Sequence, residues 1–90
     1  MVSVSQPCWV YKSKKVKYLF VYLAQEGDFD RLPDHLKIRI GELIFVLKLD
    51  LTPDRKLAKE DAKKVLENLR SCGYHLQLPA DLDPYLYFGD

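Results

Sequence analysis

The chain contains 90 residues, of which 48% are hydrophobic and 30% are charged, and its formal net charge is +1. A chain of this length has room for one domain with a single modest core. Its near-neutral charge argues against a general polyanion-binding protein, and no apolar run approaches the ~20 residues that span a bilayer. The first residues, MVSVSQ, lack the basic and apolar regions of a signal peptide, and the two cysteines, Cys8 and Cys72, are too few for a disulfide framework. Composition therefore predicts a cytoplasmic single-domain protein with reduced thiols and no membrane span.

Residues 1–7 are expected to be flexible, and a β-hairpin follows them. The stretches CWVYK (residues 8–12) and YLFVYLA (residues 18–24) are rich in β-branched and aromatic residues, and a polar lysine-rich segment separates them. In the second strand, alternation places Tyr18, Phe20, Tyr22 and Ala24 on one side and Leu19, Val21 and Leu23 on the other. Both sides are apolar, so we expect both faces of the sheet to need cover.

A short helix and a third strand are predicted next. Pro33 suits a first helical turn and Gly41 suits a C-terminal residue with positive φ, which predicts a helix over residues 33–40. The run ELIFVLKLDL, residues 42–51, is typical of a strand, and we expect this strand at the centre of the sheet. Alternation places Leu43, Phe45, Leu47 and Leu49 on one of its faces and Ile44, Val46, Lys48 and Asp50 on the other.

The strongest helical pattern follows a TPDR turn. Apolar side chains recur at spacings of three and four residues through Ala58, Ala62, Val65, Leu66, Leu69 and Cys72. The sequence offers no good capping residue just before this helix, whereas Gly73 is well suited to a positive φ at its C-terminal end. The stretch YHLQL, residues 74–78, alternates like a strand, and Pro79 is a natural end for an edge strand because it lacks an N–H.

The predicted element order is strand, strand, helix, strand, helix, strand. Strands that are apolar on both faces need helices on both sides, so we predict a small α/β (α+β) domain. It would be a three-layer α/β/α sandwich, with a four-stranded sheet that starts with the hairpin; an α+β sandwich covered on one side is the alternative. Residues 80–90 form an acidic aromatic tail. Its apolar side chains are ill suited to water, so we expect residues 82–88 to dock on their own domain or on a second copy.

Several motifs resemble, in order and spacing, those of the YcgL domain family of small bacterial proteins. They are CWVYKSKK, LFVYL, DFDRLPDHL, LTPDRKLAKEDAKKVLENL and GYHLQLP, of which the last two are the most specific, and they extend over residues 8–79. The resemblance implies a cytoplasmic single domain with an α/β/α sandwich fold. It implies no activity and supplies no catalytic residues. Some relatives are encoded beside ribonuclease D, which hints at RNA.

Candidate catalytic and metal-binding groups do not assemble in the sequence. Cys72 and His75 are close, but Cys72 falls at the negative end of a helix dipole and on the apolar stripe, so we predict a buried structural thiol. A zinc site would have to add Cys8 and His35, and this spacing does not fit a compact site. We therefore predict no catalytic residue, no metal ligand and no cofactor.

The remaining candidates are weak binding surfaces. Lys48 and Asp50 share a face near the end of their strand, where ligands bind in open α/β sheets, although a solvated charged pair is the simpler interpretation. The lysine loop, with Trp9, Tyr11 and Tyr18 nearby, suits phosphates and bases, but lysines also keep a hairpin soluble. The candidate binding residues are Lys14, Lys15, Lys17, Lys48, Asp50, Tyr85, Tyr87 and Phe88.

The leading functional hypothesis is a non-enzymatic cytoplasmic domain that acts through contacts with an unidentified protein partner, as a monomer or weak dimer. The aromatic tail and the missing catalytic constellation favour it. The alternative is an accessory module that binds RNA weakly through the lysine-rich hairpin loop. A small hydrolase is a third class, and it would need a deep pocket near Lys48 and Asp50.

Overall fold

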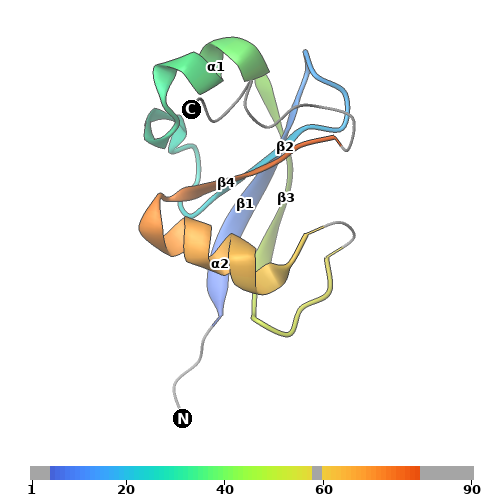
Figure 1. Ribbon diagram of the computed structural model, residues 1–90, viewed down its shortest axis with the longest axis vertical. Coiled ribbons are helices and arrows are strands. Elements are labelled where there is room, and N and C mark those ends of the chain that lie inside the picture. Colours follow the sequence, from blue (N-terminus) through green and yellow to red (C-terminus); the bar gives the residue numbers. More distant parts are fainter. Residues whose placement is uncertain (1–4, 58–59, 80–90) are drawn as a thin grey trace.

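The computed structural model describes residues 5–57 and 60–79. These residues form a small α+β fold with a four-stranded sheet and two α-helices (Figure 1). The elements are β1 (Gln6–Ser13), β2 (Phe20–Leu23), the 3-10 turn η1 (Phe29–Arg31), α1 (Asp34–Ile40), β3 (Leu43–Leu51), α2 (Ala62–Ser71) and β4 (Tyr74–Gln77). The predicted order of strands and helices is confirmed. Within the described ranges, no helix combines the length and the apolar character that crossing a bilayer requires.

The sheet is antiparallel throughout, in the order β3-β1-β2-β4. The predicted β1–β2 hairpin is present, and β4 lies at an edge as expected. The prediction of a central position for β3 is wrong, because β1 takes β3 as its second neighbour and leaves β3 at the other edge. A run that is apolar on both faces resembles a central strand, but its side chains do not reveal how many neighbours it pairs with.

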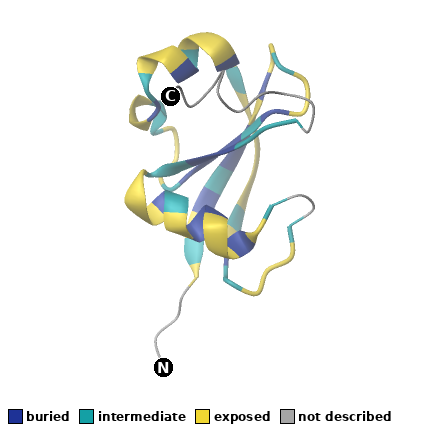
Figure 2. Cartoon of the chain, viewed as in Figure 1, coloured by how far each residue is buried: buried dark blue, intermediate teal, exposed yellow. Residues whose placement is uncertain are grey.

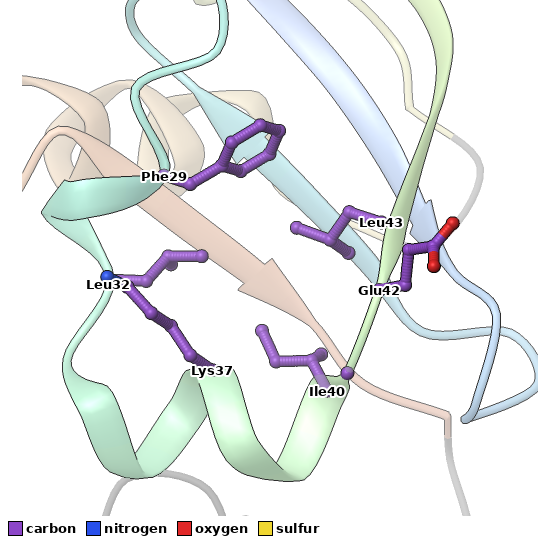
Figure 3. A pocket seen from close by; sticks show the side chains of 7 residues that line it. Phe29, Leu32, Lys37, Ile40, Glu42 and Leu43 are labelled. Atoms are coloured by element: carbon purple, nitrogen blue, oxygen red, sulfur yellow. The ribbon is translucent and has the colours of Figure 1, made fainter.

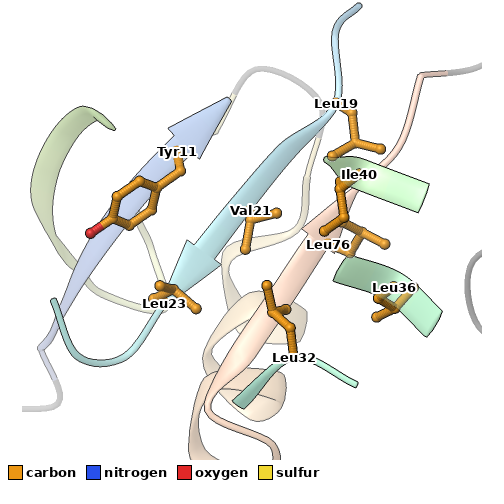
Figure 4. Packing of buried hydrophobic residues seen from close by; sticks show 8 residues of the cluster. All are labelled: Tyr11, Leu19, Val21, Leu23, Leu32, Leu36, Ile40 and Leu76. Atoms are coloured by element: carbon orange, nitrogen blue, oxygen red, sulfur yellow. The ribbon is translucent and has the colours of Figure 1, made fainter. Parts of the chain in front are cut away.

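Two hydrophobic clusters form the core. One contains Tyr11, Leu19, Val21, Leu23, Leu32, Leu36, Ile40 and Leu76, and Figure 4 shows α1 and β4 contributing to it. The other contains Cys8, Val10, Tyr22, Leu51, Ala62, Val65, Leu66 and Leu69. Their members alternate along β1 and β2, so the clusters lie on opposite faces of the sheet. We call these the α1 face and the α2 face, after the helix that packs on each.

The predicted alternation holds for β2 but fails in β3. Val10 pairs with Leu47 and Tyr11 pairs with Phe45, so that Val46 is an extra residue in a β-bulge. The faces exchange at this point: Leu43 packs against the α1-face cluster, whereas Leu49, an even number of residues away, packs against the α2-face cluster. The bulge therefore separates residues that a regular strand would have kept on one face.

Helix α2 is shorter than predicted and better capped. Asp61 is its N-cap, and the Asp61 carboxylate accepts a hydrogen bond of 3.0 Å from the Lys63 N–H. The prediction that this helix lacks a cap is wrong because it placed the start near Ala58, which lies outside the described residues. The C-terminal prediction is confirmed, since Gly73 has a φ of 84°.

Candidate interaction surface

Strand pairing arranges the α2 face in rows that cross the sheet. His75 pairs with Tyr22, Tyr22 with Val10, and Val10 with Leu47. The neighbouring row contains Gln77, Phe20, Lys12 and Ile44, which pair in the same way. We call His75, Tyr22 and Val10 the covered row, because α2 packs on Val10 and Tyr22, and we call the second set the open row. Leu47, at the β3 end of the first set, is exposed.

Apolar side chains are exposed on the part of the sheet that α2 does not cover. Ile44, Val46 and Leu47 are 39%, 41% and 43% exposed, and Figure 2 shows exposed residues along β3. A hollow of about 600 Å³ is lined by Lys12, Ser13, Lys14, Lys15, Lys17, Tyr18, Phe20 and Ile44. A second hollow of about 240 Å³ shares Phe20 with it and continues over Val46 and Leu47. The open face, as we use the term below, comprises Lys12, Phe20, Ile44, Val46 and Leu47.

The hairpin lysines border the open face, and Ser13 holds their loop in place. The Ser13 hydroxyl donates to the Ile40 carbonyl at 2.7 Å and accepts from the Lys15 and Val16 N–H groups at 3.1 and 2.8 Å. Lys14 pairs with Glu42 at 3.6 Å, with both side chains largely exposed. The loop is therefore ordered near its base, while its ammonium groups stay in solvent.

The structure separates the aromatic residues that sequence reasoning grouped with these lysines. Tyr18 is 63% exposed beside Lys17, whose ammonium lies 5.4 Å from the ring centroid. Tyr11 is buried, and its hydroxyl accepts from the Gly27 N–H at 3.0 Å. Trp9 packs against the α1-face cluster. Sequence reasoning missed Phe20, which follows the loop closely in the chain, and Ile44, which the pairing of β3 with β1 brings beside it.

Lys48 and Asp50 share a face, as predicted, but at the edge of an antiparallel sheet. They pair with Trp9 and Pro7, and the Lys48 ammonium lies 5.3 Å from the centroid of the Trp9 ring. Both residues are exposed. The expectation of a ligand site came from parallel α/β sheets, where strands end at a common crevice. This antiparallel sheet lacks that arrangement, and Lys48 instead makes a cation–π contact.

His75 is a buried part of the structure. The Asn68 side-chain amide donates to its Nδ1 at 2.8 Å, so Nε2 carries the proton and donates to the Glu60 carboxylate at 2.8 Å. The Tyr22 ring contacts the imidazole edge to face, and its hydroxyl donates to the Gln77 side chain at 2.7 Å. Both ring nitrogens are thus occupied, and the network ties β4 to α2 and to the residue that precedes its cap.

The two cysteines lie in different environments, and the prediction for Cys72 is wrong. Cys72 was predicted to be buried on the stripe of α2, but the helix ends at Ser71 and Cys72 is exposed. The periodicity was extrapolated past the end of the helix, where it no longer applies. Cys8 is fully buried, and burial raises the pKa of its thiol to about 11. Among the described residues, no group of three or more His, Cys, Asp or Glu could hold a metal ion.

A small apolar pocket of about 300 Å³ lies on the α1 face, lined mainly by Phe29, Leu32, Ile40 and Leu43. Figure 3 shows these side chains converging from η1, α1 and β3. Lys37 also lines it, but its ammonium pairs with Asp30 at 3.4 Å. The pocket is at the lower end of the size range of ligand sites, and the charged groups of its lining, Lys37 and Glu42, both form ion pairs. The tail candidates Tyr85, Tyr87 and Phe88 lie outside the described residues.

Comparisons with known proteins agree with the sequence motifs. The model of the YcgL domain matches residues 8–80. A YcgL domain-containing protein of Pseudomonas putida is 43% identical over 79 residues, which cover 88% of this chain and 81% of the relative. Another, from Thioalkalivibrio sulfidiphilus, is 45% identical over 71 residues, covering 79% and 88% of the two chains. A third, from Pseudomonas entomophila, is 42% identical over 79 residues, with coverages of 88% and 81%. The chain belongs to the YcgL domain family.

Proposed function

We propose that this chain is a non-enzymatic domain that binds a protein partner through the open face. One observation carries the proposal: an edge strand exposes consecutive apolar side chains beside a sheet face that its helix covers only in part. Monomeric proteins rarely leave such patches without a use, and an exposed strand edge is a template for contact with another chain. The expected partner surface is apolar at its centre.

Charge adds a second feature of the partner. The lysines of the hairpin loop border the open face, so acidic groups on the partner would be attracted to its rim. Such rim charges mainly raise the association rate and are screened by salt. We place this activity in the cytoplasm, in a monomer or weak dimer, and the two free cysteines are compatible with a reducing compartment.

A photo-cross-linking amino acid at position 44 tests the proposal in the native host. The same amino acid at position 45 is the matched control, because Phe45 is also exposed but contacts Tyr11 on the α1 face. We expect a specific protein adduct from position 44 and none from position 45. The captured protein, once purified, should bind the wild-type chain and lose affinity for the Ile44→Thr and Leu47→Thr variants.

Two results would overturn this function. One is that position 44 gives no protein adduct, just as the control position 45 gives none. The other is a captured protein whose affinity for Ile44→Thr equals that for the wild-type chain. Each result would mean that the exposed apolar residues of β3 do not form a contact surface.

A specific observation also supports RNA binding as the second candidate. The hollow at the hairpin places Lys12, Lys15 and Lys17 beside Tyr18 and Phe20, which is the combination that single-stranded nucleic acids require. Binding would have low micromolar affinity, weaken steeply with salt, and be lost when Lys14, Lys15 and Lys17 become Glu. Nuclease treatment before cross-linking separates the two functions, because it removes adducts that depend on RNA and leaves direct protein contacts.

A further inference from the structure

We propose that Tyr18 stacks on a base of single-stranded nucleic acid and that a strained turn of the hairpin loop presents its ring. The inference rests on the RNA-binding candidate above, and it assigns the contact with bases, as distinct from phosphates, to one residue. Three features support it: the backbone of the turn, the exposure of the ring, and the lysines around it.

The hairpin loop contains a β-turn over residues 16–19. The Leu19 N–H donates to the Val16 carbonyl at 3.3 Å, and Tyr18, at the third position of the turn, has a φ of 65°. A positive φ at this position, as in a type II turn, favours glycine or asparagine. Among the described residues, Tyr18 is the only one besides glycines with a positive φ. A bulky side chain in this backbone conformation is strained.

The residues around the turn hold Tyr18 in this conformation. Leu19 is fully buried, and Val16 packs against the α1-face cluster. The Ser13 hydroxyl accepts hydrogen bonds from the Lys15 and Val16 N–H groups. These contacts would fix the same backbone for a glycine, whereas the Tyr18 side chain is 63% exposed and gains little from burial. The fold therefore gives little reason for an aromatic ring here, and the strain points to a contact outside the chain.

The ring lies among lysines. It lines the hollow of about 600 Å³ at the hairpin, together with Lys12, Lys14, Lys15 and Lys17, and the described lining contains no carboxylate. Of these lysines, only Lys14 makes an ion pair with a residue of the described ranges. The Lys17 ammonium lies 5.4 Å from the centroid of the Tyr18 ring, so ring and charge share one site. Such a cluster of like charges attracts a polyanion.

Positive charge alone does not single out this hollow. Arg39 of α1 is also exposed and makes no ion pair within the part of the chain that the structure describes. The other exposed aromatic side chain of that part, Phe45, contacts Tyr11 edge to face on the α1 face. An exposed ring and several lysines coincide at the hairpin. Single-stranded nucleic acid carries flat rings and anionic groups in alternation and so fits both features, whereas an acidic protein segment would satisfy the lysines alone.

Binding of a labelled oligouridylate to the full-length chain tests the inference. The matched probe is an abasic phosphodiester of the same length and charge, and fluorescence anisotropy measures both affinities. We expect the wild-type chain to bind the oligouridylate about tenfold more tightly, a typical factor for a base that stacks on an aromatic side chain. Tyr18→Ala should lose this preference without weaker binding of the abasic oligomer, and Tyr18→Phe should keep it.

Urea unfolding separates this role from a structural one. Tyr18→Gly removes the ring together with the Cβ that strains the turn, so it should raise the urea midpoint and lose the preference for bases. Tyr18→Ala keeps the Cβ and should leave the midpoint close to that of the wild type. Phe45→Ala removes the other exposed ring and should keep the preference for bases. A residue that only supported the fold would lose stability and affinity together.

Three outcomes would overturn the inference. The wild-type chain could bind both oligomers equally, Tyr18→Ala could bind the oligouridylate as tightly as the wild type, or Tyr18→Gly could lower the urea midpoint. After either of the first two, the RNA-binding candidate would survive as a contact with phosphates. That candidate itself fails when the wild-type chain binds neither oligomer at low salt. The protein-binding function is tested separately, by the affinity of the captured protein for Ile44→Thr.

Discussion

The covered and open rows lie side by side on the same face of the sheet but have different environments. In the covered row, Val10 and Tyr22 are 6% and 7% exposed beneath α2. In the open row, Phe20 is partly buried, while Lys12 is exposed and Ile44 is 39% exposed. Both rows come from the same four strands, although the bulge at Val46 shifts the pairing of β1 with β3 between them. The difference arises because α2 packs on Val10 and Tyr22, whereas Lys12 and Ile44 remain exposed.

This difference shows how apolar residues with the same pattern acquire two roles. Beneath the helix, an apolar side chain contributes to the free energy of unfolding through burial. Beyond the helix, the same kind of side chain contributes little to stability and is available for contact with another surface. Variants in the two rows and in the helix should therefore separate stability from binding.

The largest effect is expected where the helix covers the sheet. Leu66 lies on the buried side of α2 and is 3% exposed. Leu66→Ala should lower the free energy of unfolding by about 2–5 kcal/mol, because it removes buried apolar surface and leaves a cavity. Urea unfolding measures this cost. Lys64→Ala on the exposed side of the same helix should change it by less than ~0.5 kcal/mol, and equal effects would place α2 off the sheet.

The hydrogen-bond network at the end of the covered row should give the next largest effect. Glu60→Ala leaves the His75 Nε2–H group without its acceptor in a side chain that is 10% exposed. We expect a loss of about 1–3 kcal/mol in the free energy of unfolding. Glu60→Gln keeps an acceptor and should lose less. Glu67→Ala, on the exposed side of α2, is the control, and a similar loss from this variant would contradict the role of the network.

The two cysteines compare a covered with an uncovered position directly. Cys8→Ser should cost about 1–3 kcal/mol, because it places a hydroxyl without a partner in the α2-face core. Cys72→Ser should stay within ~0.5 kcal/mol, since Cys72 is exposed. A thiol reagent applied to the native protein should modify Cys72 rapidly and Cys8 only on unfolding. Rapid modification of both would mean that β1 is not covered by α2.

Alkaline pH should weaken the core between the sheet and α2, which contains Cys8 and Tyr22. Burial raises the pKa of Cys8 to about 11, and burial together with the charge of Glu60 raises the pKa of Tyr22 to about 12. In the unfolded chain these two groups ionise near pH ~8.5 and ~10. As pH rises, the unfolded chain therefore loses their protons at a lower pH than the folded chain does. Their contribution is therefore complete below pH ~8.5 and is lost as pH rises through 11 and 12.

The urea midpoint between pH ~8 and ~11 measures this loss. Tyr22→Phe and Cys8→Ala should each make the decline shallower, since each removes one of the groups. Cys72→Ser is the control and should leave the decline as steep as in the wild type. A decline that neither Tyr22→Phe nor Cys8→Ala alters would contradict the assigned cause.

Some features of the two rows could be predicted from the sequence and others could not, for a physical reason. The order of strands and helices, the hairpin, the edge position of β4 and the positive φ of Gly73 follow from local patterns, and all were predicted correctly. The edge position of β3, the bulge at Val46 and the exposure of Ile44 depend on which strands pair and where a helix ends. Alternation identifies the side on which a residue lies, but not whether anything packs against it.

The same limit explains the candidate site. The lysine loop was recognisable from its composition, whereas its neighbour Ile44 comes from a strand that is distant in sequence and pairs with β1. The assignment of Cys72 to the core failed for a related reason, because periodicity was carried past the last residue of α2. Features that depend on local sequence patterns were thus predictable, and features that depend on tertiary packing were not.

The free energy of unfolding of the full-length Ile44→Thr variant tests the central claim most directly, because the claim is that the open row does not belong to the core. Threonine keeps the strand preference while removing apolar surface. Urea unfolding should give a value within ~0.5 kcal/mol of the wild type, as for other exposed positions. A loss of about 2 kcal/mol or more, comparable to that of Leu66→Ala, would show that Ile44 is part of the core and would contradict a contact surface there.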